Sequence, residues 1–213
     1  MSAYQDSSGK SLEDYPRPSV AVDTAVLTMD PGAGLVVLEV RRPSGMGWAL
    51  PGTFLYPSET LADAVDRSLR LKAGIRGLRP RQLRVFDDPQ RDDRGWVLSV
   101  AHVDVVQVGR LAARLPTTRL VPVHSPGRLP YDHTDIIALA VRHIRSRYED
   151  EPDPDHLLDD EFTVRELRLV HEAIAGRPLQ RDTFRRTMEP HLVATGAMTA
   201  GSRGRPAELF RRA

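Results

Sequence analysis

Residues 163–188, TVRELRLVHEAIAGRPLQRDTFRRTM, decide the fold of the C-terminal part of the chain. The first four of them form a capping box, in which the first side chain and the fourth side chain satisfy each other's backbone N–H groups. Phe162 and Leu167 stand at the two positions of a hydrophobic staple around this box. We therefore expect a helix that starts at Thr163, with an apolar face that runs from Leu167 to Ile174.

A second, shorter helix follows after a tight turn. Gly176-Arg177-Pro178 interrupts the helical pattern, and the pattern resumes near Arg181 with Phe184 and Met188 at inward positions. The spacing predicts two helices joined by a turn.

Two short strands complete this unit. Residues 193–197 and 208–212 can pair around the glycine-rich tip GSRGRP at 201–206. Two helices followed by a hairpin predict a winged helix-turn-helix over residues 163–213.

The second helix carries several arginines. Arg181 and Arg185 lie four residues apart with Arg186 beside them, and like charges at this spacing repel each other when they are unpaired. A DNA duplex would relieve this repulsion, since a recognition helix uses arginine for phosphates and for guanine edges. The alternative is a solvated basic face that Asp182 partly neutralises through Arg186, and the helix alone favours neither interpretation.

The tip of the hairpin favours nucleic acid. Arg203-Gly204-Arg205-Pro206 is a slim strip with two guanidinium groups, which suits the negative potential of a narrow minor groove. We therefore predict double-stranded DNA as a partner. The expected DNA-binding residues are Arg181, Thr183, Arg185, Arg186, Arg203 and Arg205.

Charge and composition agree with this division and exclude several classes of protein. Residues 163–213 hold ten arginines and five acids, a net of +5, whereas residues 1–162 hold 20 basic and 24 acidic residues, a net of −4. The absence of cysteine excludes a disulfide scaffold, a thiol nucleophile and thiolate zinc fingers. No apolar run approaches the roughly 18 residues of a membrane span, and the first residues lack the apolar core of a secretion signal. We expect a cytoplasmic protein, associated with the nucleoid and not with a membrane.

The N-terminal part alternates strands and helices. The predicted strands cover residues 20–29, 35–40, 82–87 and 95–106, and the predicted helices cover about 60–73 and 133–148. The first two strands form a hairpin around the turn DPGAG, and residues 45–52 are expected to be a loop. Elements mixed in this order predict an α/β sandwich.

Two segments have compositions that do not favour folding. Residues 1–18 are polar, and residues 149–161 contain eight acids and two prolines. We therefore expect a disordered tail at 1–18, a first domain at 19–148, an acidic linker at 149–161 and a second domain at 162–213.

The segment from Leu50 to Ile75 resembles the Nudix box, G-x5-E-x7-R-E-U-x-E-E-x-G-U, in which U is aliphatic. Glu59, Arg67 and Gly74 match this pattern, and Leu69 and Ile75 occupy aliphatic positions, whereas Thr53 replaces the glycine. The resemblance implies a Nudix-like α/β/α sandwich. Together with the C-terminal winged helix-turn-helix predicted above, this gives an α+β fold class.

Three glutamates of the box are missing. Ser68, Leu71 and Lys72 stand at positions that share a helix face, where the Nudix family gathers magnesium against a pyrophosphate with carboxylates. Lys72 would repel the metal, and Glu59 alone cannot hold it. We therefore expect no metal site, no catalytic residue and no cofactor, but a domain that binds a nucleotide-like ligand without hydrolysing it.

A degenerate Nudix domain followed by a winged helix-turn-helix resembles the NrtR family, the Nudix-related transcriptional regulators of NAD metabolism. The resemblance extends from about Ser19 to Ala213 and includes three further stretches. These are DPQRDDRG at 88–95 with VLSVA at 97–101, GRPL at 176–179 with FRR at 184–186, and RGRPA at 203–207. It implies a homodimeric repressor of NAD synthesis or salvage genes, with ADP-ribose or a related NAD derivative as the effector.

The expected effector-binding residues are Arg41, Arg42, Trp48, Gly52, Glu59 and Arg67. Strand alternation places Arg41 and Arg42 on opposite sheet faces, so one can clamp a phosphate while the other is solvated. Trp48 either stacks on an adenine or caps the core. Arg67 either contacts a pyrophosphate or pairs with Asp63 or Glu59.

The histidines are not expected to be ligands. His102, His133 and His171 are interpreted as packed or surface residues, because no second histidine or carboxylate cluster accompanies them.

Two functions of different class remain besides the ligand-sensing regulator. One is an active Nudix pyrophosphohydrolase that an accessory module recruits to nucleic acid, and the face at positions 68, 71 and 72 argues against it. The other is a nucleotide-binding adaptor without DNA specificity, which the arginine tip disfavours.

Overall fold

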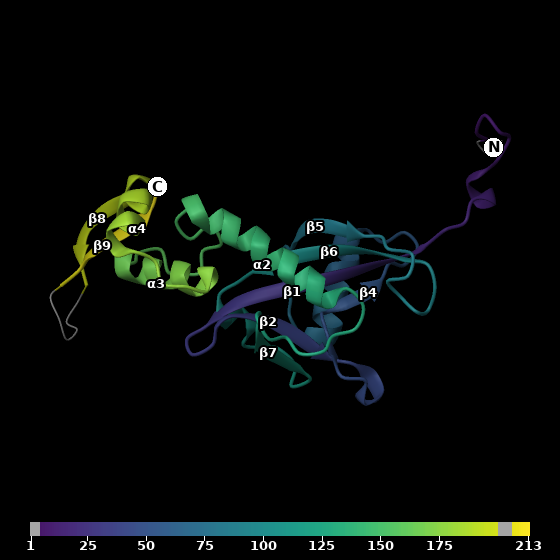
Figure 1. Ribbon diagram of the computed structural model, residues 1–213, viewed down its shortest axis with the longest axis horizontal. Helices are drawn as coiled ribbons and strands as arrows, with labels where there is room; N and C mark the ends of the chain where they lie inside the picture. The colour runs from purple at the N-terminus through teal and green to yellow at the C-terminus, as the bar shows by residue number, and fades with distance from the viewer. Residues whose placement is uncertain (1–4, 200–205) are drawn as a thin grey trace.

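The computed structural model describes residues 5–199 and 206–213, and Figure 1 shows it down its shortest axis. The N-terminal part contains β1 (Ser19–Asp30), β2 (Gly34–Arg41), β3 (Trp48–Ala49), β4 (Gly52–Phe54), α1 (Leu61–Ser68), β5 (Arg81–Phe86), β6 (Val97–Val105), β7 (Thr118–Pro122) and α2 (His133–Asp150). The C-terminal part contains α3 (Val164–Ala175), α4 (Arg181–Met188), β8 (Leu192–Met198) and β9 (Glu208–Arg212). Within the described residues, no helix combines the length and the apolar composition that crossing a membrane requires.

One mixed sheet forms the frame of the N-terminal domain. Its strands are ordered β3-β2-β1-β6-β5, while β4 pairs with β1 and β7 pairs with β2. β1 and β6 run parallel, and the β1–β2 pair is antiparallel. The predicted hairpin is confirmed: Asp30 opposes Gly34, and the Asp30 side chain accepts hydrogen bonds from two backbone N–H groups inside the turn.

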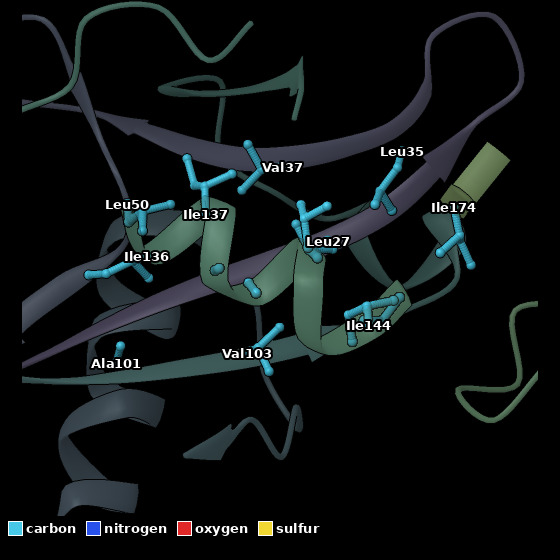
Figure 2. Close-up of a cluster of buried hydrophobic side chains, with 14 of the residues drawn as sticks. Leu27, Leu35, Val37, Leu50, Ala101, Val103, Ile136, Ile137, Ile144 and Ile174 are labelled. Carbon is cyan, nitrogen blue, oxygen red and sulfur yellow. The ribbon is translucent and has the colours of Figure 1, made fainter. Parts of the chain in front are cut away.

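Helices cover both faces of the sheet, so the predicted α/β/α sandwich is confirmed. On one face, α2 packs Ile136, Ile137 and Ile144 against strand residues that include Leu27, Val37 and Val103 (Figure 2). On the other face, α1 packs Ala64 and Val65 against strand residues that include Val22, Val26 and Leu38. This division follows from the two-residue period of a strand, which sends neighbouring side chains to opposite faces.

The predicted helix at 60–73 is confirmed, with a change of geometry inside it. Thr60 forms a capping box with Asp63, and Gly74 ends the helix with a left-handed φ of 73°. Residues Leu69–Ala73 form a π-helix. Of the three positions expected on one face, Ser68 is buried, whereas Leu71 and Lys72 are exposed.

Three strands were not predicted. The expected loop at 45–52 contains β3 and the first residue of β4, and β7 was also missed. β3 has two residues and β4 has three. Strands this short contain no readable alternation, and they form here because β1 and β2 offer free backbone groups as partners.

The C-terminal part is the predicted winged helix-turn-helix. Thr163 caps α3 through Glu166, and Gly176 ends that helix with a φ of 70°. β8 and β9 pair antiparallel. A separate small core joins the helices and the hairpin, and its buried members are Phe162, Leu167, Phe184, Met188 and Phe210.

The segment expected to be an unfolded linker is ordered. Asp153 is fully buried, and its carboxylate accepts hydrogen bonds from the backbone N–H groups of Leu157 (2.8 Å) and Leu158 (2.9 Å). The Tyr148 hydroxyl, at 3.1 Å, and the Arg212 guanidinium donate to the same carboxylate. An acid of this segment thus serves as an internal acceptor, which composition alone does not reveal.

α2 connects the two parts of the molecule. It leaves the sheet and ends next to α3 (Figure 1), and Ile174 of α3 packs in the same core as Ile144 of α2 (Figure 2). Residues 5–18 lie at the other end of the long axis and contain a short 3₁₀ helix, Leu12–Asp14, with no buried residue.

Candidate functional site

A cavity of about 660 Å³ opens between β1, β2, β4 and the segments that follow β5 and precede α2. We call it the basic cavity, because five arginine or lysine side chains and two carboxylates line it. Its charged and aromatic lining residues are Asp23, Arg41, Arg42, Phe54, Lys72, Arg91, Asp92, Arg94, Tyr131 and His133.

A buried acid lies at the bottom of the basic cavity. The Ser99 hydroxyl donates to Asp23 Oδ2 at 2.5 Å, and His133 Nε2 lies 3.2 Å from Asp23 Oδ1. Burial alone would raise the pKa of Asp23, but the contacts with His133, Ser99 and Arg91 outweigh it and lower the pKa. Asp23 is therefore held as a carboxylate whose charge is already matched.

His133 is packed, as expected, but the expectation that no carboxylate accompanies it was wrong. The backbone N–H of Leu50 donates to His133 Nδ1 at 3.0 Å, so the proton of a neutral ring is on Nε2, toward Asp23. His102 and His171 are also buried. Asp23 and His133 lie far apart in the sequence, and no local pattern links them.

Arg91 is the most unusual residue of the basic cavity. Its side chain is 2% exposed, and its Nε donates to Asp132 at 2.6 Å. Its buried Nη2 has no hydrogen-bond partner among the described residues, and Asp23 Oδ2 lies 3.8 Å away. A buried N–H without an acceptor is costly, so this atom is ready to take a ligand oxygen as its partner.

Arg94 lies beside Arg91 with a different environment. It binds the Asp92 carboxylate with two nitrogens, at 2.8 and 2.6 Å, which lowers the pKa of Asp92. Its guanidinium also lies over the rings of Phe54 (5.1 Å) and Tyr131 (5.0 Å). The sequence singled out this stretch only by its resemblance to the NrtR family, and no residue of it was expected at the ligand.

Lys72 and Gly52 meet at another wall of the cavity. The Lys72 ammonium donates to the carbonyl oxygen of Gly52. Its side chain remains accessible, but partial desolvation by the cavity wall lowers its pKa. Gly52 allows a close approach, because a Cβ there would lie 1.9 Å from Asp23 Oδ1.

Magnesium, which the Nudix fold implies, does not fit these residues. Ser68 is buried and its hydroxyl has no partner, Leu71 is aliphatic, and Lys72 brings a positive charge. Asp23 and Asp92 are each bound to other side chains. In the described ranges, no three His, Cys, Asp or Glu residues are arranged to hold a metal ion.

Three of the expected effector-binding residues line the basic cavity: Arg41, Arg42 and Gly52. The expectation that the two arginines separate to opposite faces was wrong. β2 ends at Arg41, and the chain turns into a 3₁₀ helix after Arg42, so both side chains reach the cavity. Arg42 also lies over the Tyr131 ring, 5.7 Å from its centre.

The other three do not line it. Arg67 forms an ion pair with Glu59 at 2.7 Å, donates to the Phe54 carbonyl at 2.7 Å and stacks on Tyr56 at 3.9 Å. Of the alternatives for Arg67, the structure shows the pair with Glu59. Trp48 is half-buried, with the Arg119 guanidinium 4.4 Å from its ring centre.

α4 presents a polar face to solvent. Phe184 and Met188 are buried, as predicted. Arg185 is not unpaired, as the repulsion argument assumed, because it binds Glu189 at 2.9 Å. The candidate DNA contacts Arg181, Thr183, Arg185 and Arg186 are all exposed, whereas Arg203 and Arg205 lie outside the described residues.

Comparisons with known proteins bear on both parts of the chain. Residues 154–212 match the model of the NrtR DNA-binding winged helix domain. The chain is 29% identical over 209 residues to the ADPR responsive transcriptional repressor NtrR of Acinetobacter baylyi, a match that covers 93% of this chain and 83% of that protein. The structure of Shewanella oneidensis NrtR with a 27mer DNA has a TM-score of 0.74 at 29% identity, over 91% of this chain and 93% of that one. Residues 154–212 thus match the NrtR DNA-binding domain, and the chain as a whole is similar to NrtR repressors.

These similarities confirm the resemblance to NrtR regulators that the motifs predicted. The N-terminal domain is also similar to an enzyme, the ADP-ribose pyrophosphatase of Methanocaldococcus jannaschii. The two are 30% identical over 130 residues, which cover 60% of this chain and 76% of that protein.

Proposed function

We propose that the protein is a DNA-binding transcriptional repressor of NAD synthesis or salvage genes that senses ADP-ribose or a related NAD derivative. One observation carries the proposal: a single chain joins a basic cavity without metal ligands to a winged helix whose exposed helix carries arginines. The relative from Acinetobacter baylyi is a repressor that responds to ADPR, and NrtR of Shewanella oneidensis binds DNA.

The basic cavity offers groups for both ends of such an effector. Arg41, Arg42 and Lys72 make no ion pair with a carboxylate among the described residues, and they suit phosphate oxygens. The aromatic rings of Phe54 and Tyr131 suit stacking on a base. The exposed face of α4 suits the major groove.

We propose that the protein is not a hydrolase. The similarity to an ADP-ribose pyrophosphatase favours the alternative of an active Nudix enzyme. The residues at positions 68, 71 and 72 oppose it, because none of them supplies a hard oxygen anion for magnesium.

We also propose a cytoplasmic homodimer on an inverted repeat. Each chain has one winged helix, and a two-fold protein reads a two-fold site whose halves lie about one or two helical turns apart. Sedimentation and footprinting test this. A monomer that protects a single half-site contradicts it.

Selection from random duplexes by the full-length protein tests the main proposal. We expect enrichment of one sequence, and we expect ADP-ribose to change the affinity for that sequence. A thermal-shift series with ADP-ribose, NAD and related nucleotides identifies the effector, since a ligand of the folded state raises the midpoint. DNA binding without enrichment would favour the adaptor, and no response to any nucleotide would contradict sensing.

A further inference from the structure

We propose that the basic cavity binds the pyrophosphate of its effector through protein cations alone, with Lys72 at the place where a Nudix enzyme holds magnesium. This inference rests on the proposed function, because it takes ADP-ribose as the ligand. It adds that effector binding needs no divalent metal and that Lys72 determines this independence.

The charge balance of the basic cavity favours an anion over a metal ion. Both carboxylates that line it already have partners: Asp23 accepts a hydrogen bond from Ser99 and lies near His133 and Arg91, and Asp92 pairs with Arg94. Neither carboxylate is therefore free to bind a divalent cation in the cavity. Three of the five lining cations, Arg41, Arg42 and Lys72, make no ion pair with a described residue. The surplus charge is therefore positive, which attracts a pyrophosphate and repels a metal ion.

The position of Lys72 places a positive charge on the wall of the cavity. In the Nudix box its place belongs to a carboxylate that holds magnesium, whereas here an ammonium on the cavity wall donates to the neutral carbonyl of Gly52. The partial desolvation of this ammonium lowers its pKa, and a bound anion would offset that penalty. Lys72 thus supplies positive charge for the pyrophosphate. It also repels magnesium, which would otherwise supply that charge.

Arg91 provides an independent observation. Its side chain is 2% exposed, and its buried Nη2 has no hydrogen-bond partner among the described residues, although Arg91 lines the cavity. A buried donor of this kind calls for an acceptor from a ligand. A phosphate oxygen has the charge and the acceptor capacity to fill that role.

The test measures the Kd of the full-length protein for ADP-ribose by calorimetry, with excess EDTA and with magnesium chloride at equal ionic strength. We expect the same Kd in both buffers. Lys72→Met should weaken binding by about ten- to a hundred-fold in both, because it removes one charge-assisted hydrogen bond. Lys72→Glu should bind still more weakly in both buffers, because its carboxylate repels the pyrophosphate and one carboxylate alone does not hold magnesium. Arg70→Met is the matched control, since Arg70 lies on the same π-helix but does not line the cavity, and its Kd should not change.

Wild-type binding that EDTA abolishes would overturn the inference, as would Lys72→Met binding like Arg70→Met. The thermal midpoints of the unliganded variants show whether each one folds. Inorganic pyrophosphate is the second probe. If it binds in EDTA and ADP-ribose does not, the proposed effector is wrong and the inference stands; if neither binds, both fail.

Discussion

The carboxylate of Asp153 accepts a hydrogen bond from the guanidinium of Arg212, 59 residues later in the chain. Asp153 follows α2, and Arg212 is the last residue of β9. The same carboxylate accepts a hydrogen bond from the hydroxyl of Tyr148, which lies near the end of α2. The buried carboxylate of Asp153 therefore links β9 of the C-terminal domain to the long helix of the N-terminal domain by hydrogen bonds.

Asp153→Asn should destabilise the protein by about 3–5 kcal/mol, because it leaves the Arg212 guanidinium without its buried partner. Urea unfolding of the full-length chain measures this. Asp160→Asn, in the same acidic segment but exposed, is the control and should stay within about 0.5 kcal/mol of wild type. Equal effects of the two substitutions would show that the buried pair contributes nothing specific.

The stability of the protein should fall in mild acid because of His171. Its Nδ1 donates to the Tyr148 carbonyl at 3.0 Å, and burial lowers its pKa from 6.5 to about 4. Since the folded pKa lies below the unfolded value, the unfolded state takes up the proton first. The contribution of His171 is complete above pH 6.5 and is lost as the pH falls toward 4.

Between about pH 7.5 and pH 5, this linkage amounts to about 2 kcal/mol. Denaturant unfolding at both pH values should show a drop smaller by that amount in His171→Gln than in wild type. His124→Gln, at an exposed position, should keep the full drop. Parallel curves for all three proteins would contradict a buried neutral His171.

Gly52→Ala should disturb the basic cavity, because the added Cβ would lie 1.9 Å from Asp23 Oδ1. We expect a loss of about 1–3 kcal/mol in unfolding free energy from the forced backbone shift, together with weaker binding of ADP-ribose. Gly109→Ala meets no atom within 4 Å and serves as the control. A Gly52→Ala protein with wild-type stability and affinity would mean that the cavity wall yields freely.

Substitutions of the α4 arginines and of the expected wing-tip arginines should change DNA binding in different ways. Replacing Arg185 or Arg186, if the side chain reads a base edge, should cost about 1–3 kcal/mol on the selected sequence and much less on random DNA. Replacing Arg203 and Arg205 together should weaken binding to every sequence and reduce the log–log salt slope by about one unit for each phosphate that is no longer neutralised.

Binding isotherms on selected and random duplexes at several salt concentrations distinguish these effects. Arg76→Ala, an exposed arginine of the N-terminal domain, is the control and should leave both quantities unchanged. A tip variant that binds like wild type at every salt concentration would remove the tip from the DNA interface.

Incubation with ADP-ribose and magnesium should release no AMP above a blank without protein. The reason is the replacement of the three metal-binding glutamates by Ser68, Leu71 and Lys72. Chromatography of the nucleotides measures the product. Magnesium-dependent turnover that Glu59→Gln abolishes would show that a metal site survives with other ligands.

Local features of this fold could be predicted because their causes are local. The start of α3 at Thr163 depends on hydrogen bonds to a residue three positions away, and the end of the helix that begins with α1 depends on the left-handed conformation of Gly74. The short strands β3, β4 and β7 could not be predicted, since each depends on a partner strand elsewhere in the chain.

The expectations about the sites also divide between local features, which could be predicted, and contacts between distant residues, which could not. Arg41, Arg42 and Gly52 were expected at the ligand and line the basic cavity, whereas Arg67 and Glu59 match the Nudix motif but bind each other. Asp23 and Arg91 were missed, because each is one charged residue among many in the sequence.

By itself, the sequence determined the order of the long helices and strands, the sandwich followed by a winged helix, the residues other than glutamate at three positions of the Nudix-like box, and the basic character of the C-terminal part. Periodicity, capping and residue identity encode these features within a few neighbouring positions. Only the tertiary structure decided which charges meet: Asp23 from β1 comes together with Ser99 from β6 and His133 from α2, and Asp153 with Arg212. A charged side chain can be buried only where groups of opposite charge or hydrogen-bonding groups lie next to it. The positions of those groups depend on the packing of the whole chain.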